Sequence, residues 1–169
     1  VSNDVNAQNW LTISDMKGMF VRDTAEQITR TALERFNMVI VPAKTILLSF
    51  KLTVGRVTIA SVPLCTNEAI AHFVNVPTIE HEYLYQQLRC FDYRKLGNTS
   101  AIGNAINSKL VKSMKLVLPT ADKLEVFHKM AAPVFDKILS LTKQNSNLSR
   151  QRDLLLPRLM SGKLSINVD

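Results

Sequence analysis

The hydrophobic pattern divides the chain into a β-rich first half and a helical second half. Short runs of β-branched and aromatic residues, separated by proline, glycine and polar residues, predict strands over 38–41, 45–51, 56–61 and 69–76. Residues 1–28 are mixed, and their scattered apolar positions indicate an extended segment or short strands. Thr29 is typical of a helix N-cap and predicts a short helix over 30–36, while Gly55 favours a tight hairpin turn.

After residue 78 the apolar positions take up a helical period. A helix of about 13 residues is predicted by the spacing of Ile79, Tyr83, Leu84, Leu88 and Phe91 along one face. A polar loop containing two glycines follows over 96–104. We expect Ser108 to cap a short helix over 109–114, and residues 115–118 predict a strand that Pro119 closes.

Beyond Pro119 the chain is predicted to be helical almost to its end, with Pro133 either kinking one helix or beginning a second. Apolar residues recur at every seventh position, namely Phe127, Val134, Leu141, Leu148 and Leu155. The alternate seam position holds Ala131, Ile138, Asn145 and Arg152. This heptad pattern predicts pairing with another long helix, in which the two polar residues would fix the register. The alternative is a surface helix that packs on its own domain.

Together the elements predict an α+β chain, in which a small, mixed or antiparallel β-rich domain is followed by a long C-terminal coiled-coil-forming helix. A hydrophobic content of 46% and a mean hydropathy of +0.04 indicate a folded chain. No apolar run approaches the ~18 residues of a membrane span, and the first ten residues lack the basic and apolar regions of a signal peptide. We expect Cys65 and Cys90 to be free thiols in a reducing cytoplasm.

The net charge of +7 is concentrated in the C-terminal third of the chain. Residues 1–108 hold ten Lys and Arg against nine Asp and Glu, whereas residues 109–163 hold eleven against four. Such a bias favours a polyanion or an acidic protein as partner. A solvated, lysine-rich helix face is the alternative interpretation.

The common catalytic motifs are missing from the sequence. It contains no nucleophile elbow, phosphate-binding loop, dinucleotide fingerprint or zinc-protease motif, and no glycine-rich nucleoside site with an N-P-P-Y-like segment. Asp15 and Lys17 fit half of a nuclease motif, but only Asp4 precedes them as a carboxylate. We therefore predict a protein without catalytic residues, which is not itself an enzyme.

A zinc site in this chain would need four residues together, Cys65, His72, His81 and Cys90. Their spacings of seven, nine and nine residues lack the close ligand pairs of structural zinc sites. These residues are expected to be ordinary core or surface residues, and no metal site is predicted.

Residues suited to DNA contact occur at the ends of the predicted elements. Basic side chains that can reach phosphates are Lys51, Arg56, Arg94, Lys95, Lys109 and Lys112. Amides and hydroxyls that can bond base edges cluster in and after the polar loop, at Asn98, Thr99, Ser100, Asn104 and Asn107. An ordinary polar loop is the alternative.

Five stretches follow one another over most of the chain: LSFKLTVGRV at 48–57, TNEAI at 66–70, EYLY at 82–85, the loop, helix and strand over 97–118, and a tail over 148–164 that ends in RDLLLPRLMSGKL. In this order they resemble the specificity subunits of type I restriction-modification systems. Ser49, Lys51, Gly55, Arg56 and Asn67 match motifs of the family's framework. Gly55 and Asn67 are at least as well explained by a structural role, in a turn or in the sheet, as by contact with DNA.

The resemblance implies a target-recognition domain over residues 1–118, a conserved helical spacer and dimerisation region over 119–160, and a tail over 161–169. Such subunits carry two recognition domains and two antiparallel helices, read a bipartite site in double-stranded DNA and dock modification subunits. S-adenosylmethionine, ATP and Mg²⁺ would lie on the modification and restriction subunits, so the chain itself would need no cofactor. It would be either the C-terminal half of a longer subunit or a natural half-sized one, whose two copies would read a symmetric interrupted site.

Two other functions stay open. A protein-interaction scaffold with a recognition-like domain would work through its C-terminal helix. A piece of a fused methyltransferase-nuclease would have its catalytic motifs outside this sequence.

Overall fold

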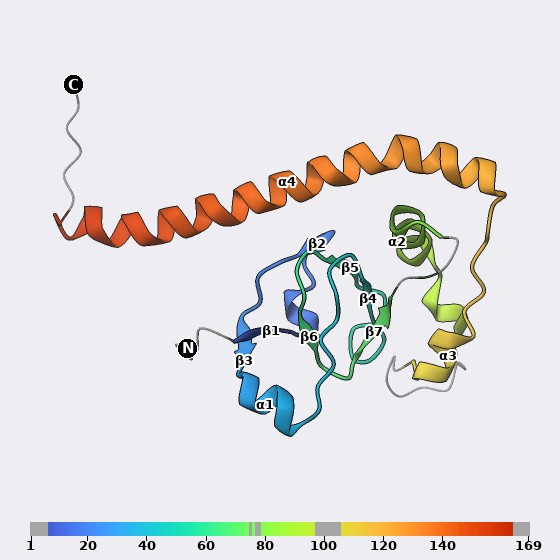
Figure 1. Cartoon of the computed structure of the whole chain (residues 1–169), viewed down its shortest axis with the longest axis horizontal. Coiled ribbons are helices and arrows are strands. Elements are labelled where there is room, and N and C mark those ends of the chain that lie inside the picture. Colours follow the sequence, from blue (N-terminus) through green and yellow to red (C-terminus); the bar gives the residue numbers. More distant parts are fainter. Residues whose placement is uncertain (1–6, 75, 77–78, 97–105, 164–169) are drawn as a thin grey trace. The chain divides into compact units, whose positions relative to one another are not determined.

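The computed structural model describes residues 7–74, 76, 79–96 and 106–163 (Figure 1). The chain forms two compact units, Val1–Ala132 and Pro133–Asp169. The first combines two mixed sheets with short helices, and a helix of 40 residues follows them in the sequence. The predicted α+β class, with β-rich elements before a long C-terminal helix, is confirmed.

The larger sheet has the strand order β2-β5-β4-β7. Its strands are β2 (Phe20–Val21), β4 (Ile46–Ser49), β5 (Val57–Ala60) and β7 (Ile70–Phe73). β4 pairs antiparallel with both β5 and β7, while β2 pairs parallel with β5. Every residue of β4 and β5 is buried, which explains why their sequences read as continuous apolar runs instead of alternating ones.

The smaller sheet has the order β3-β1-β6, from β1 (Gln8–Leu11), β3 (Glu26–Ile28) and β6 (Cys65–Thr66). β1 runs antiparallel to β3 and parallel to β6. Apolar side chains from both sheets and from the loops between them share one core, which includes Leu11, Met16, Val21, Val41, Leu47, Ala60, Leu64 and Ile70. Burial of each large aliphatic side chain contributes roughly 1.5–3 kcal/mol, so this core fixes the framework on which the loops are carried.

Short helices complete the first unit. The 3₁₀ helix η1 (Ile13–Asp15) lies between β1 and β2, and α1 (Arg30–Arg35) follows β3. Thr29 caps α1 as predicted by accepting a hydrogen bond from the Ala32 N–H. α2 (His81–Cys90) packs on β4 and β5 through Leu84, Tyr85 and Leu88. The 3₁₀ helix η2 (Tyr93–Leu96) and α3 (Ser108–Lys112) follow.

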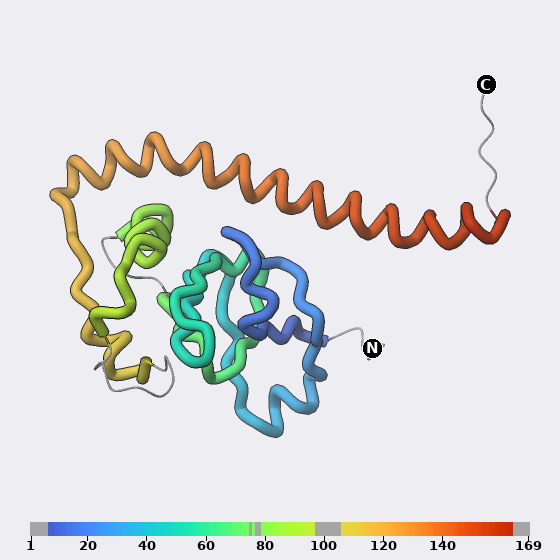
Figure 2. The backbone as a smooth tube through the Cα atoms, turned by 180° about the vertical axis from the view of Figure 1, so that it is seen from behind, coloured from blue at the N-terminus to red at the C-terminus, as the bar shows by residue number. Residues whose placement is uncertain are grey.

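α4 (Ala121–Met160) is one continuous helix with Pro133 and Pro157 inside it, and Figure 2 traces it as an unbroken coil. At 1.5 Å per residue its length is about 60 Å. Of the two predicted arrangements at Pro133, the single helix is the one observed. Among the described residues, none of the helices combines the length and apolar character needed to cross a membrane.

Two predicted strands are wrong. Over 38–41 only Val41 pairs, in a bridge with Leu64, because Val39 and Ile40 point to solvent. Residues 115–118 form no strand, because the backbone groups of Val117 bond side chains of α2 instead of a neighbouring strand.

Three further details differ from the prediction. Asn107, not Ser108, caps α3, since its Oδ1 accepts the Leu110 N–H at 2.9 Å. Gly55 lies in a loop over 50–56 instead of a two-residue turn. The short strand β6 was not predicted, because two residues are too few to give a pattern.

Candidate nucleic-acid interface

The loop over residues 50–56, between β4 and β5, is closed by Ser49 at the end of β4. The Ser49 hydroxyl donates to the Thr53 carbonyl and accepts the Arg56 N–H at 3.0 Å. The Gly55 N–H donates to the Ser49 carbonyl at 3.0 Å. Ser49 therefore acts as framework that fixes where the neighbouring basic side chains leave the sheet.

Gly55 is required for two reasons. Its φ of +90° lies in the left-handed region, which L side chains rarely adopt. A Cβ at this position would also lie 2.9 Å from Cδ2 of Tyr93. The loop is thus pressed against η2, and the framework reading of Gly55 is the one that the geometry supports.

Lys51 and Arg56 occupy the two sides of this loop. The Lys51 ammonium lies 5.9 Å from the centre of the Phe50 ring. Arg56 is exposed, but its Nη1 donates to the Ile13 carbonyl at 3.0 Å. This Nη1–H group of Arg56 therefore holds the loop against η1, and the other N–H groups of the guanidinium could donate to a phosphate.

The loop also anchors the segment that begins α3. The Ile106 N–H donates to the Phe50 carbonyl at 3.0 Å, and Ile106 and Val111 are buried. Lys109 and Lys112 are exposed on α3, which carries no acidic residue. The loop over 50–56, η2 and α3 therefore meet, and each brings basic residues to the same part of the first unit.

Two further predicted contact residues, besides Arg56, have partners within the chain. Arg94 bonds Asp92 through Nε at 2.8 Å, and this hydrogen bond lowers the pKa of the Asp92 carboxyl. The Arg94 side chain is 92% exposed, so a phosphate could replace Asp92. The side-chain oxygen of Asn107 is engaged in capping α3. Asn98, Thr99, Ser100 and Asn104 lie outside the described residues.

Asn67 has the framework role that its motif suggested. Its Oδ1 accepts the Ala69 N–H at 3.1 Å, and this bond shapes the turn between β6 and β7. Beside it, Trp10, Thr66 and His72 contribute to a cavity of about 310 Å³, in which the Thr66 hydroxyl and His72 Nε2 are 2.7 Å apart. Cys65 is buried and Cys90 is exposed, and both are free thiols, as predicted.

The heptad positions of α4 form an exposed apolar stripe. The side chains of Val134, Leu141, Leu148 and Leu155 are 55%, 44%, 61% and 45% exposed. Asn145 and Arg152 are exposed and Ile138 is half-buried. Phe127 differs from the rest, because its ring packs edge-on against Tyr83 at 5.6 Å between centroids. An exposed stripe of this kind is the surface that a second long helix would cover.

The comparisons with known proteins agree on one family. The family model of the type I restriction modification DNA specificity domain matches residues 2–148. The HindI specificity subunit from Haemophilus influenzae is 28% identical over 160 residues, which cover 92% of this chain and 35% of that protein. The MjaIX specificity subunit from Methanocaldococcus jannaschii is 34% identical over 56 residues, which cover 33% of this chain and 13% of that protein. The chain thus spans about a third of the HindI relative.

Solved structures show the same fold at low identity. The HsdS subunit from Thermoanaerobacter tengcongensis superposes with a TM-score of 0.56 at 13% identity and covers 96% of this chain and 40% of its own. A chain from a study of complex assembly and conformational transition of the type I R-M system gives a TM-score of 0.60 at 14% identity, covering 93% and 39%. The family model spans most of the sequence, and the chain therefore belongs to the family of type I restriction-modification DNA specificity domains.

Proposed function

We propose that this chain reads one half of a bipartite site in double-stranded DNA as a non-catalytic specificity component of a type I restriction-modification complex in the cytoplasm. The observation that carries the proposal is the meeting of three basic segments, the loop over 50–56, η2 and α3, on a buried framework. Basic side chains on short, anchored elements suit phosphate contact, which sets the position of a reader on the duplex. Base reading is assigned to the polar residues between η2 and α3.

The same proposal gives α4 the role of pairing surface. The exposed side chains of Val134, Leu141, Leu148 and Leu155 would pack against a second helix, from another recognition half or a second copy of this chain. Modification subunits, which hold S-adenosylmethionine and methylate adenine, would dock on the assembled pair. Restriction subunits, which use ATP and Mg²⁺, would join through them.

The test is to express the chain with a modification subunit of its system and to map methylated adenines in plasmid DNA exposed to the complex. One recurring interrupted sequence is expected, and it should be symmetric if two copies of the chain pair. Replacing Lys51 or Arg56 should weaken DNA binding by the complex. Methylation without any sequence preference would refute DNA reading by this chain.

A protein-interaction scaffold is the second candidate, and the exposed stripe of α4 is the observation that favours it. One set of variants distinguishes the two functions. Alanine at Asn98, Asn104 and Arg56 should abolish selective DNA binding if the chain reads DNA. The same changes should leave partner binding intact in either case.

A further inference from the structure

A buried carboxylate lies at the N-terminal end of α2. The Glu82 side chain is only 3% exposed, although removing a charged carboxylate from water is costly unless it is paired. Both of its oxygens face imidazoles: His81 Nε2 lies 3.2 Å from Oε1, and His128 Nδ1 lies 3.2 Å from Oε2. His128 belongs to the first turns of α4, within the same compact unit as α2.

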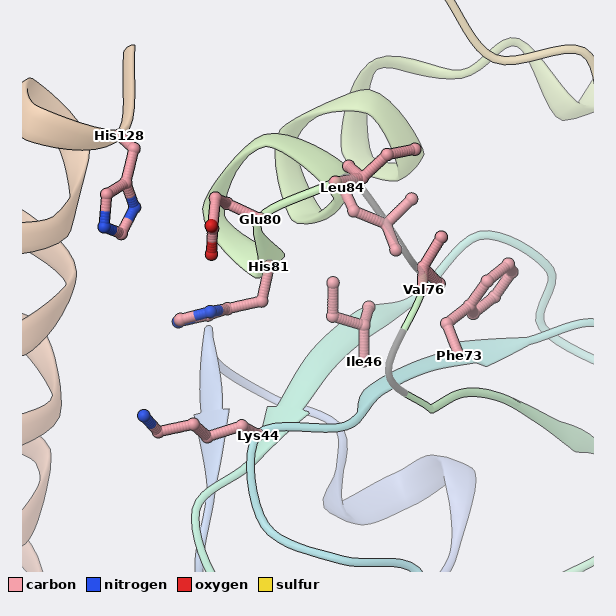
Figure 3. Close-up of a pocket in the computed structure, with 9 residues that line it drawn as sticks. Lys44, Ile46, Phe73, Val76, Glu80, His81, Leu84 and His128 are labelled. Atoms are coloured by element: carbon pink, nitrogen blue, oxygen red, sulfur yellow. The ribbon is translucent and has the colours of Figure 1, made fainter. Parts of the chain in front are cut away.

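Glu80 adds a second carboxylate to this cluster. It occupies the N-cap position of α2, yet its side chain makes no capping hydrogen bond. One oxygen of Glu80, one of Glu82 and one ring nitrogen of His128 all lie within 4.8 Å of one another. Figure 3 shows the polar ends of Glu80, His81 and His128 directed toward the same space.

Glu80, His81 and His128 form the polar wall of a cavity of about 470 Å³, whose other side is lined by Ile46, Phe73 and Leu84. The Lys44 side chain also lines the cavity. Two carboxylates against this single ammonium leave an excess of negative charge when the imidazoles are neutral. A divalent cation bound by both carboxylates would offset their two negative charges.

We propose that Glu80, Glu82 and His128 bind a divalent transition-metal ion, with zinc as the best match, while His81 orients Glu82 through its other oxygen. Zinc bonds of 2.0–2.1 Å in a tetrahedron place neighbouring ligand atoms roughly 3.3 Å apart. The distance from His128 Nδ1 to Glu82 Oε2 is 3.2 Å and already fits this geometry, while the exposed Glu80 carboxylate, within 4.8 Å of both, would move closer as the ion binds. An imidazole ligand favours zinc, nickel, cobalt or copper over magnesium and calcium, which prefer oxygen alone.

The fourth coordination position would face the cavity and hold water. The ion would join the first turn of α2 to the first turns of α4 by direct bonds, and it would stabilise this unit by binding only its folded form. The inference does not rest on DNA reading, since none of these residues is among the proposed DNA contacts.

The test uses the full chain, stripped with a chelator and then titrated with zinc chloride in a calorimeter. One zinc ion per chain and a raised Tm are expected. His128→Ala should weaken binding by at least about 100-fold, and Glu80→Gln by about 10-fold, in the range found when metal sites lose supporting groups. Cobalt in place of zinc should give d–d absorption bands that His128→Ala removes.

Two control variants separate this site from surface binding. Glu125→Gln removes an exposed carboxylate that pairs with Lys129 on the same helix, and His72→Gln removes an imidazole outside the cluster. Both should bind zinc like the wild type. Because loss of a ligand from a buried cluster can unfold the chain, Glu80→Gln, an exposed position, is the decisive variant, with its fold checked by circular dichroism. If zinc does not bind saturably, or if folded Glu80→Gln binds zinc like the wild type, the proposal is overturned. The cluster would then only hold α2 to the first turns of α4 by hydrogen bonds.

Discussion

The hydroxyl of Tyr83 donates a hydrogen bond to the main-chain carbonyl of Val117 at 2.8 Å. The ring of the same tyrosine packs edge-on against Phe127, and its oxygen also accepts a bond from Gln87 at 2.9 Å. One side chain of α2 thus holds both the segment before α4 and the first turns of α4 itself.

Removing these contacts in two steps should separate their contributions. Tyr83→Phe loses the hydrogen bonds and should lower the free energy of unfolding by about 0.5–1.5 kcal/mol. Tyr83→Ala also loses the ring packing on Phe127, and about 2–3 kcal/mol is expected for this half-buried aromatic. Urea unfolding followed by circular dichroism measures both values. Equal stability of the two variants would contradict a role for the ring.

Gly55→Ala should destabilise the chain by about 2–4 kcal/mol, because a strained left-handed backbone and a clash with Tyr93 act together. Gly162→Ala is the matched control. Gly162 also has a positive φ of 68°, but a Cβ there would meet nothing within 4 Å. Its cost should be about 1 kcal/mol in the same thermal or urea unfolding experiment. Similar costs for both would show that the approach to Tyr93 is relaxed in solution.

Replacing Lys109 or Lys112 by alanine should weaken DNA binding almost equally for all sequences, because phosphates carry no base identity. Each loss should reduce the slope of log affinity against log salt by about 1. Fluorescence anisotropy of the assembled complex over a range of salt concentrations measures that slope. Lys123→Ala, another exposed lysine outside α3, is the control and should leave the slope unchanged.

Leu141→Asp places a charge in the exposed stripe of α4 and should convert a paired form into a monomer in sedimentation. Ser140→Asp introduces the same charge at the adjacent exposed position, outside the seam, and should preserve pairing. A mass that does not change with Leu141→Asp would exclude the stripe as the pairing surface.

Desolvation of the ring lowers the pKa of His72 below its ordinary value of 6.5. Since the native state then binds fewer protons than the unfolded state, this residue contributes stability above pH 6.5 that falls as the pH drops below it. The effect should be small, because the residue is partly exposed. An NMR titration of the ring should give a midpoint below that of the same chain in urea, and coincident midpoints would contradict the shift.

The framework was largely predictable because its signals are local. β4 and β5 follow from short branched runs between turn residues, and the Thr29 cap from one side chain three residues before its partner. The run over 38–41 has the same composition as a strand, and only its exposure, which depends on the rest of the fold, distinguishes it.

The candidate sites were predicted less well, since their geometry joins residues far apart in sequence. Arg56 bonds a carbonyl 43 positions away, and Glu82 meets an imidazole 46 positions away. From the sequence, His81 is a candidate metal ligand only together with Cys65, His72 and Cys90, which are near it along the chain. No spacing rule relates Glu82 to His128, and their proximity arises because the first turns of α4 contact α2.

The central position of β4 has a consequence for how the molecule moves. Its four residues are buried and bonded on both sides, so their amide hydrogens should exchange with solvent only when the whole unit unfolds. Among the described residues, by contrast, one backbone bond, from Ile106 to Phe50, ties the start of α3 to the neighbouring loop. We expect its amides to exchange through local opening many times faster. The segments proposed to contact DNA would then adjust to the duplex while the sheet that carries them keeps its shape.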